Sequence, residues 1–252
     1  MSKKLEEIDT FARDTLGATP EAVRILGKIN EEMAEEQFTE NMRLYLGRSM
    51  IPRKLVPLVA LAVSLAQGQR ESSLIHYRLA KKFDAAVDDI LDVIKISKMA
   101  VMASTLSTMT SILPVVSSFE AIELRDKETE KIMANVVRES GNAQPPENLS
   151  ALSKLSFDLF DEHIRERMEL LSPISLDKKT VYLVAFAVSV SLRDQSCAPV
   201  YLNQYFRNGG GTRNMEDAIS IARFVTGNKV ITTSMDMLND IVSKLEAEDK
   251  DK

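Results

Sequence analysis

Apolar residues recur along most of the chain at the spacing of an α-helix. Val87, Ile90, Leu91 and Ile94 stand at positions i, i+3, i+4 and i+7, the stripe of an amphipathic helix. A second helical stripe lies within 132–137. No stretch alternates between apolar and polar residues as a half-buried strand does, so the pattern predicts an all-α protein.

Two segments, 58–66 and 183–189, are almost wholly apolar. Their β-branched residues would suit strands, but their length and lack of alternation favour buried helices. Helix starts are also visible in the sequence. A capping residue, a proline and an acid follow one another at 19–21, and 145–147 gives much the same start.

One stretch of sequence occurs twice in the chain. Residues 58–64, Leu-Val-Ala-Leu-Ala-Val-Ser, recur at 183–189 as Leu-Val-Ala-Phe-Ala-Val-Ser, a displacement of 125 residues. The same displacement pairs Pro20 with Pro145. Because unrelated segments do not keep such a register, the chain is interpreted as two tandem copies of one helical unit.

The two copies are expected to run over 1–116 and 117–252. Beyond Ala80 we expect the register to slip by about three residues, taken up in the glycine-rich loop at 208–212. Each copy is small for an independent domain, and no flexible linker separates them. We therefore expect the copies to pack against each other as one pseudo-symmetric body.

The net charge of the chain and the length of its uncharged segments limit the kinds of partner it can bind. Lys and Arg number 32 against 37 Asp and Glu, a net charge of -5, which is the wrong sign for a protein that neutralises phosphates. Taken as the longest uncharged runs, Leu55–Gln69 and Thr180–Leu192 fall short of the roughly 20 residues that span a bilayer. We expect no nucleic-acid partner, no membrane contact and, without a secretory h-region, a cytoplasmic location.

The chain has a single cysteine, Cys197, and two histidines, His76 and His163. One cysteine excludes an intrachain disulfide, a CxxC redox centre and a thiolate zinc site. The histidines lack metal-binding spacing, and no phosphate loop is present. We therefore expect neither a metal nor a cofactor, and His163, among charged neighbours, is expected on the surface.

The first candidate site lies on the helix that follows Gly68. Gln69, Ser72 and His76 stand at i, i+3 and i+7, so they share one face near the start of that helix and are expected to line a groove. His76 is the side chain best able to exchange a proton near neutral pH. A histidine without a paired acid is also common as a purely structural residue.

The second candidate site is the matching face of the second copy, formed by Asp194, Cys197 and Tyr201. The start of a helix would lower the pKa of the Cys197 thiol, whereas Asp194 would raise it. A reactive thiol here could be oxidised to a sulfenic acid. The alternative is a small buried side chain without chemistry.

The sequence resembles the carboxymuconolactone decarboxylase family, which includes the alkylhydroperoxidase D-like proteins. The resemblance is carried by Pro52-Arg53, by 58–64, by the turn at Gly68 and by His76, and residues 178–210 resemble the family again. It implies an all-α fold in which each copy is one family domain. It also implies a homo-oligomer, a trimer in preference to a dimer.

Redox members of that family carry a motif of Glu, eleven residues, Cys, two residues, Cys, three residues and His. Here the four motif positions hold Pro57, Gln69, Ser72 and His76 in the first copy and Tyr182, Asp194, Cys197 and Tyr201 in the second. Neither copy can run a two-cysteine disulfide cycle. The decarboxylase members do not depend on the cysteine pair, so its loss is compatible with acid or base chemistry.

We expect a carboxymuconolactone decarboxylase-like protein of unassigned substrate, without the peroxidase centre and with a small-molecule site at His76. One alternative is a one-cysteine peroxidase that uses Cys197. Another is a cofactor-free decarboxylase or hydrolase in which His76 is the general acid or base. The non-enzymatic alternative is an oligomeric scaffold or ligand-binding protein.

Overall fold

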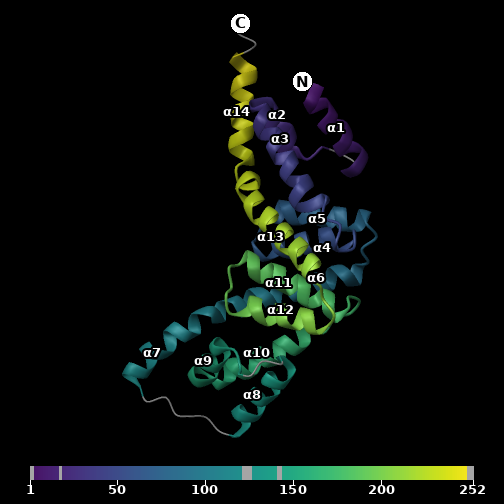
Figure 1. The fold of residues 1–252 in the computed structure, drawn as a ribbon. Helices are drawn as coiled ribbons and strands as arrows, with labels where there is room; N and C mark the ends of the chain where they lie inside the picture. The colour runs from purple at the N-terminus through teal and green to yellow at the C-terminus, as the bar shows by residue number, and fades with distance from the viewer. Residues whose placement is uncertain (1–2, 17–18, 121–126, 141–143, 249–252) are drawn as a thin grey trace.

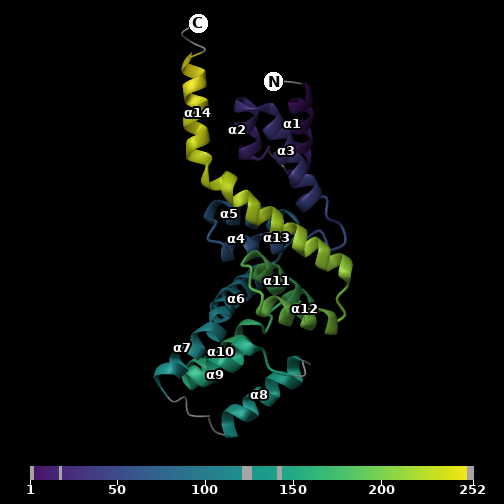
Figure 2. The same cartoon turned by 60° about the vertical axis from the view of Figure 1, so that its left-hand side comes forward.

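The computed structural model describes residues 3–16, 19–120, 127–140 and 144–248. Within these ranges every regular element is helical, which confirms the all-α prediction. Figures 1 and 2 show the helices in three stacked groups, with both termini at one end. The group beside the termini contains α1 (Lys3–Leu16), α2 (Glu21–Ile29), α3 (Glu31–Glu40) and α14 (Met235–Glu248).

The central group holds the candidate sites. It contains the π-helical segment η1 (Asn41–Leu46), α4 (Leu55–Ala66), α5 (Arg70–Lys82), α6 (Val87–Ser104), α11 (Lys178–Ser191), α12 (Cys197–Arg207) and α13 (Thr212–Thr233). The far group contains the 3₁₀ turn η2 (Thr105–Thr108), α7 (Met109–Phe119), α8 (Lys127–Ser140), α9 (Glu147–Leu155) and α10 (Phe157–Leu170). Continuous chain links α6 through η2 to α7.

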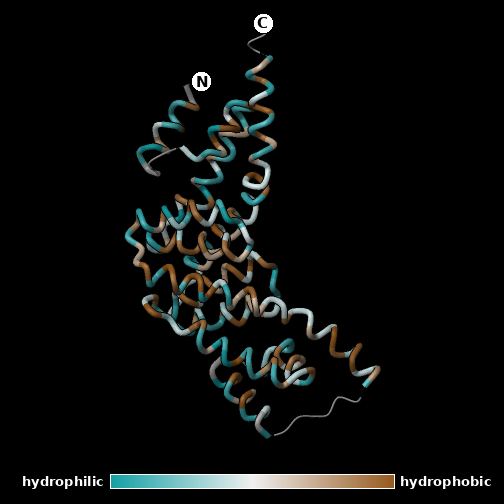
Figure 3. The backbone as a smooth tube through the Cα atoms, turned by 180° about the vertical axis from the view of Figure 1, so that it is seen from behind, coloured by the Kyte–Doolittle hydropathy of each residue, from teal (hydrophilic) through white to brown (hydrophobic). Residues whose placement is uncertain are grey.

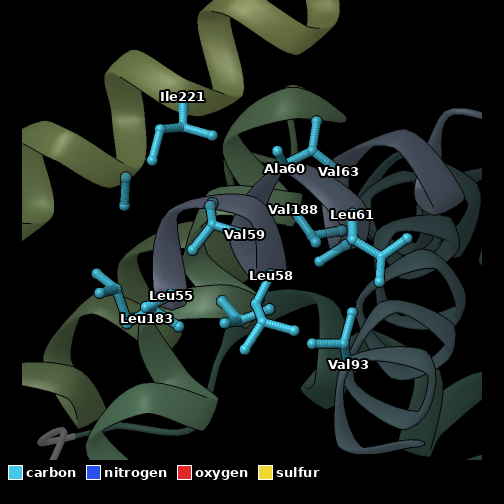
Figure 4. Close-up of a cluster of buried hydrophobic side chains, with 14 of the residues drawn as sticks. Leu55, Leu58, Val59, Ala60, Leu61, Val63, Val93, Leu183, Val188 and Ile221 are labelled. Atoms are coloured by element: carbon cyan, nitrogen blue, oxygen red, sulfur yellow. The ribbon is translucent and has the colours of Figure 1, made fainter. Parts of the chain in front are cut away.

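The core is centred on α4 and α11, which lie against each other. Leu58 and Val184 are completely buried, and nearly all their helical neighbours are buried too. Figure 4 shows α4 side chains meeting Val93 of α6, Leu183 of α11 and Ile221 of α13. A helix covered on every side needs no polar face, which explains why these two segments lack helical periodicity.

Several landmarks of the central helices in the two halves lie 125 residues apart. α6 begins at Val87 and α13 at Thr212, 125 residues apart. Two left-handed turns correspond in the same way, Gly68 (φ 68°) with Arg193 (φ 59°) and Asp84 (φ 61°) with Gly209 (φ 82°). The slip expected beyond Ala80 is therefore wrong, because both turns into the next helix use one left-handed residue and have equal length.

The opening helices correspond at a displacement of 126 instead. Pro20 precedes α2 and Pro146 precedes α9 with nearly the same backbone angles. Asn30 and Ser156 both cap the next helix by accepting a hydrogen bond from a backbone N–H three residues on. The predicted pairing of Pro20 with Pro145 is therefore wrong by one residue, because Pro20 corresponds to Pro146.

The last helix of each half packs against the first helices of the other half. α14 packs against α2, and α7 packs against α9, as the grouping in Figures 1 and 2 shows. α7 also runs across the expected boundary between residues 116 and 117. The two halves therefore interleave and do not stand side by side as separate units.

Two buried carboxylates tie the halves together. Asp92 of α6 accepts hydrogen bonds from the backbone N–H groups of 174–176, at 2.7, 2.8 and 2.9 Å. Asp217 of α13, displaced by 125 residues, accepts from those of 50–51, at 2.8 and 3.2 Å. Each carboxylate thus fixes the loop that leads into the other half's central helix.

Three of the four apolar residues in the α6 stripe face outward, and the fourth, Ile90, packs against the core. Val87, Leu91 and Ile94 are exposed, whereas Asp89 and Asp92 are buried because they find hydrogen-bond donors inside the protein. Most of the stripe that predicted this helix therefore lies outside the core. The pattern predicted the helix, whose inner face also carries the carboxylates of Asp89 and Asp92.

A third uncharged run, Met99–Phe119, is longer than the two considered from the sequence. Among the described residues, Val87–Phe119 is the one helix that by length and composition could cross a membrane, and 22% of its most apolar stretch is buried. Its first half is part of the core through Val93 and Ile96. The expectation that every uncharged run is too short does not hold.

Candidate functional site

The first candidate site is a buried face of α5. Gln69 directly precedes the helix, and Ser72 and His76 follow within it, all three with little exposed surface. They share one face as predicted. That face is turned toward the protein interior, so it does not line an open groove.

Tyr45 of η1 covers His76. Its hydroxyl lies 2.9 Å from Nδ1 of His76, and its ring stacks on Phe224 of α13 with a centroid distance of 5.4 Å. Burial lowers the pKa of His76 to about 4 and raises the pKa of Tyr45. His76 is therefore a neutral imidazole at pH 7 with one ring nitrogen already engaged.

Gln69 links α5 to α13. Its Nε2 donates to the carbonyl of Val225 at 3.1 Å, while its Oε1 is buried without a hydrogen-bond partner. The hydroxyl of the neighbouring Ser73 lies 2.8 Å from the carbonyl oxygen of Gln69 and 3.0 Å from Ser64 Oγ, and it donates its one hydrogen to either of them. These contacts form a buried polar cluster where α5 meets α4 and α13.

The second candidate site forms where α12 begins. Asp194 Oδ1 accepts from the backbone N–H groups of Ser196 and Cys197, both at 3.0 Å, and so caps the helix. The Cys197 thiol faces the carbonyl of Ala103 at 3.7 Å, and Asn148 Nδ2 approaches its sulfur at 3.8 Å. The site therefore joins α12 to α6 and α9.

The Cys197 thiol is held protonated. Burial, followed by the negative charge of Asp194, raises its pKa to about 12. The helix start at Cys197 does not offset these two effects. At pH 7 only about one thiol in 10⁵ is a thiolate, the form that attacks peroxides.

Tyr201 lies deepest in the second site. It is completely buried, and its hydroxyl has no hydrogen-bond partner; Asp194 Oδ2 is also buried and without one. The guanidinium carbon of Arg167 lies 5.7 Å from the centroid of the Tyr201 ring. Burial raises the pKa of Tyr201, with opposing effects from Arg167 and Asp194, so the phenol stays neutral and can donate.

His163 lies one helical turn before Arg167 on α10. The expectation that it is a surface residue is wrong, because its side chain is buried and its charged neighbours occupy other faces of the helix. Burial and then the charge of Arg167 lower its pKa to about 4. His163 is thus neutral at pH 7, like His76.

Sequence reasoning missed three contributors: Tyr45, Arg167 and Asn148. At the displacement of 126, Arg167 corresponds to Asn41, so only the second half carries a cation at this point. This difference in charge between the two halves can be predicted from the sequence once the displacement is known. Among the described residues, no group of three or more His, Cys, Asp or Glu is placed to hold a metal ion.

The fold resembles that of a solved bacterial protein. A crystal structure from Burkholderia xenovorans LB400, described provisionally as a gamma-carboxymuconolactone decarboxylase subunit, matches with a TM-score of 0.77. The match covers 95% of this chain and 97% of that chain at 15% sequence identity, so it shows a shared fold. No family model and no curated protein sequence matches the chain.

Proposed function

We propose that this carboxymuconolactone decarboxylase-like protein binds a small carboxylated molecule in its second half, beside Arg167, Tyr201 and Asp194. The observation that carries the proposal is the pair of buried polar atoms without partners, Tyr201 Oη and Asp194 Oδ2. A buried polar group left unpaired costs about 1 to 3 kcal/mol, which a ligand that pairs with it recovers. The partly exposed Arg167 and Cys197 mark the side from which a ligand would enter.

The three side chains would each bind a different chemical group of the ligand. The guanidinium of Arg167 suits a carboxylate. The Tyr201 phenol donates to a carbonyl or ether oxygen, while Asp194 Oδ2 accepts from a hydroxyl. The ligand class is therefore a hydroxylated or lactone-bearing carboxylic acid, in line with the name given to the structural relative.

The ionisation of the candidate groups favours binding over the catalytic alternatives. His76 and His163 have a pKa of about 4, and Cys197 has a pKa of about 12. A general acid or base works best with a pKa near the operating pH. The one-cysteine peroxidase and the His76 acid–base enzyme therefore have less support, and the cytoplasmic location stays a prediction.

Calorimetric titration tests the proposal. A panel of small hydroxy acids and carboxylated lactones is titrated into the wild type, and at least one member should bind with a Kd below about 1 mM. Arg167→Gln and Tyr201→Phe should each weaken that binding by about tenfold or more. Tyr45→Phe, the same substitution at a buried tyrosine of the first site, should leave it unchanged.

Two outcomes would contradict the proposal. One is a panel without a binder, and the other is binding that Arg167→Gln does not weaken. NMR of the same mixtures reports whether the ligand is converted, and loss of a carboxyl group as carbon dioxide would favour the lyase alternative.

A further inference from the structure

A third buried polar atom without a hydrogen-bond partner lies beside the proposed ligand site. It is Oγ of Ser189 on α11, and its side chain is completely buried. The other two are Tyr201 Oη and Asp194 Oδ2, which carry the proposed function. Buried polar side chains are normally paired, so three unpaired atoms in one part of the molecule call for an explanation.

The two halves connect their central helices in the same way at this point. In the first half the backbone N–H of Gln69 donates to the carbonyl of Ser64 at 2.9 Å. In the second half the backbone N–H of Asp194 donates to the carbonyl of Ser189, also at 2.9 Å. α12 packs on α11 as α5 packs on α4. The two pairs of helices can therefore be compared position by position.

The first half shows how the serine at this position is satisfied. At a displacement of 125, Ser64 and Ser73 correspond to Ser189 and Ala198. The Oγ atoms of Ser64 and Ser73 lie 3.0 Å apart, and Ser64 donates to the carbonyl of Leu61 at 2.9 Å. A serine side chain exceeds an alanine side chain by one oxygen atom. Ala198 therefore leaves Ser189 without its partner and leaves room beside it for an oxygen atom from elsewhere.

Ala198 also lies in the middle of the proposed site. Asp194, Ala198 and Tyr201 stand at positions i, i+4 and i+7, so they share one face where the chain enters α12. The Ser189 hydroxyl faces Ala198, as Ser64 faces Ser73 in the first half. All three unpaired atoms therefore meet at the same part of the interface between α11 and α12.

We propose that Ser189 determines the specificity of this site by donating to a hydroxyl oxygen of the ligand, whose own hydrogen is accepted by Asp194 Oδ2. The inference rests on the proposed function. A hydroxyl group has one hydrogen to donate and two lone pairs that accept, so it satisfies both side chains at once. A keto oxygen has no hydrogen for Asp194, and a deoxy analogue pairs with neither residue. The site therefore selects a hydroxy acid over the corresponding keto acid.

The surroundings of Ser189 strengthen this selection. Its neighbours along α11 are Val188 and Val190, and Figure 3 shows many hydrophobic residues in the central group of helices. In an apolar environment a polar group that the ligand fails to pair costs more free energy than at an open surface. Sites built to bind a hydroxyl group accordingly reject analogues that lack it.

Calorimetry with matched acids tests the proposal. The tightest-binding hydroxy acid of the panel is compared with its keto and deoxy analogues; 2-hydroxyglutarate with 2-oxoglutarate and glutarate is one such set. The wild type should bind the hydroxy acid at least about tenfold more tightly than the other two. Ser189→Ala should weaken binding of the hydroxy acid about tenfold and change binding of the keto acid by less than about twofold. Ser64→Ala, the same substitution in the first half, should leave both affinities unchanged.

Ala198→Ser is the converse test. It rebuilds the serine pair of the first half, so it should raise the melting temperature of the free protein. It should also weaken binding of the hydroxy acid by about tenfold, because the new hydroxyl takes the place of the hydroxyl of the ligand. Thermal unfolding without ligand checks that Ser189→Ala and Ser64→Ala keep the fold.

Three results would overturn this inference and leave the proposed function standing. They are hydroxy-acid binding that Arg167→Gln weakens but Ser189→Ala does not, equal affinity for the hydroxy and keto acids, and binding of carboxylated lactones alone. Equal loss of both acids in Ser189→Ala would also overturn it, because a bound water or altered helix packing would explain such a loss. A panel without a binder, or binding that Arg167→Gln does not weaken, would overturn both proposals.

Discussion

The first and second candidate sites stand at corresponding points of one fold, yet they are completed in different ways. In the first, the neutral Tyr45 closes over His76, and one buried polar atom, Gln69 Oε1, has no partner. In the second, Arg167 and Asp194 bring opposite charges around Tyr201, and two buried polar atoms have no partner. The helix that carries a site determines where the side chains of that site point. The residues that cover the site come from other helices, and they determine whether a ligand can enter.

The strongest test of this correspondence is removal of the two crossing carboxylates. Asp92→Ala leaves three backbone N–H groups without their acceptor and should lower the free energy of unfolding by about 4 kcal/mol. Asp217→Ala leaves two and should cost about 3 kcal/mol. Urea denaturation measures both. A loss below about 1 kcal/mol in either variant would show that the two halves are not held by these carboxylates.

A pH series tests whether both halves bury a neutral histidine. His76 and His163 have folded pKa values of about 4 against 6.5 for the free side chain, so the unfolded chain binds more protons between these values. Stability is therefore complete above pH 6.5 and falls as the pH approaches 4. Each histidine should contribute about 2 kcal/mol to the loss between pH 7 and pH 5.

The matched variants in that series are His76→Gln and His163→Gln. Each should remove about half of the histidine-dependent change in unfolding free energy between pH 7 and pH 5, measured by urea denaturation at both values. An unchanged pH dependence in one variant would show that its histidine titrates normally in the folded protein.

Two tyrosine variants sharpen the contrast between the sites. Tyr45→Phe removes the partner of His76 and should destabilise the protein by about 1 to 2 kcal/mol. Tyr201→Phe removes a hydroxyl that has no partner, so stability should stay the same or rise slightly. Thermal unfolding compares them. Equal destabilisation by the two changes would mean that the Tyr201 hydroxyl is paired in solution.

The smallest effect is expected at Cys197. With a thiol pKa of about 12, Cys197→Ser should leave peroxide consumption at the background rate of the wild type. The folded protein should also react slowly with iodoacetamide at pH 7 and much faster in urea. Rapid modification of the native protein would show a thiol far more acidic than the structure implies.

Much of the fold could be predicted from the sequence because its signals are local. The apolar segments 58–64 and 183–189 identified both central helices and their displacement. The outward face of α6 was not predictable in the same way, since Asp92 is buried only because 174–176 supply three donors. A pattern of apolar residues does not reveal which polar side chains will find partners inside.

The candidate sites show the same limit. That Gln69, Ser72 and His76 share a face follows from helix geometry alone. That this face is closed depends on Tyr45, which lies on a different element 31 residues earlier. Arg167 is likewise brought to Tyr201 by the packing of α10, which no spacing along the chain records.

The exchange of α7 and α14 has a consequence for how such a chain could arise. Neither half can complete its own core, so a free single half would survive only as an intertwined pair whose assembly depends on concentration. Joining the halves covalently makes that step intramolecular, and the partner is then always present. Once joined, the halves no longer need to stay identical, so one site can close around Tyr45 while the other keeps its charges.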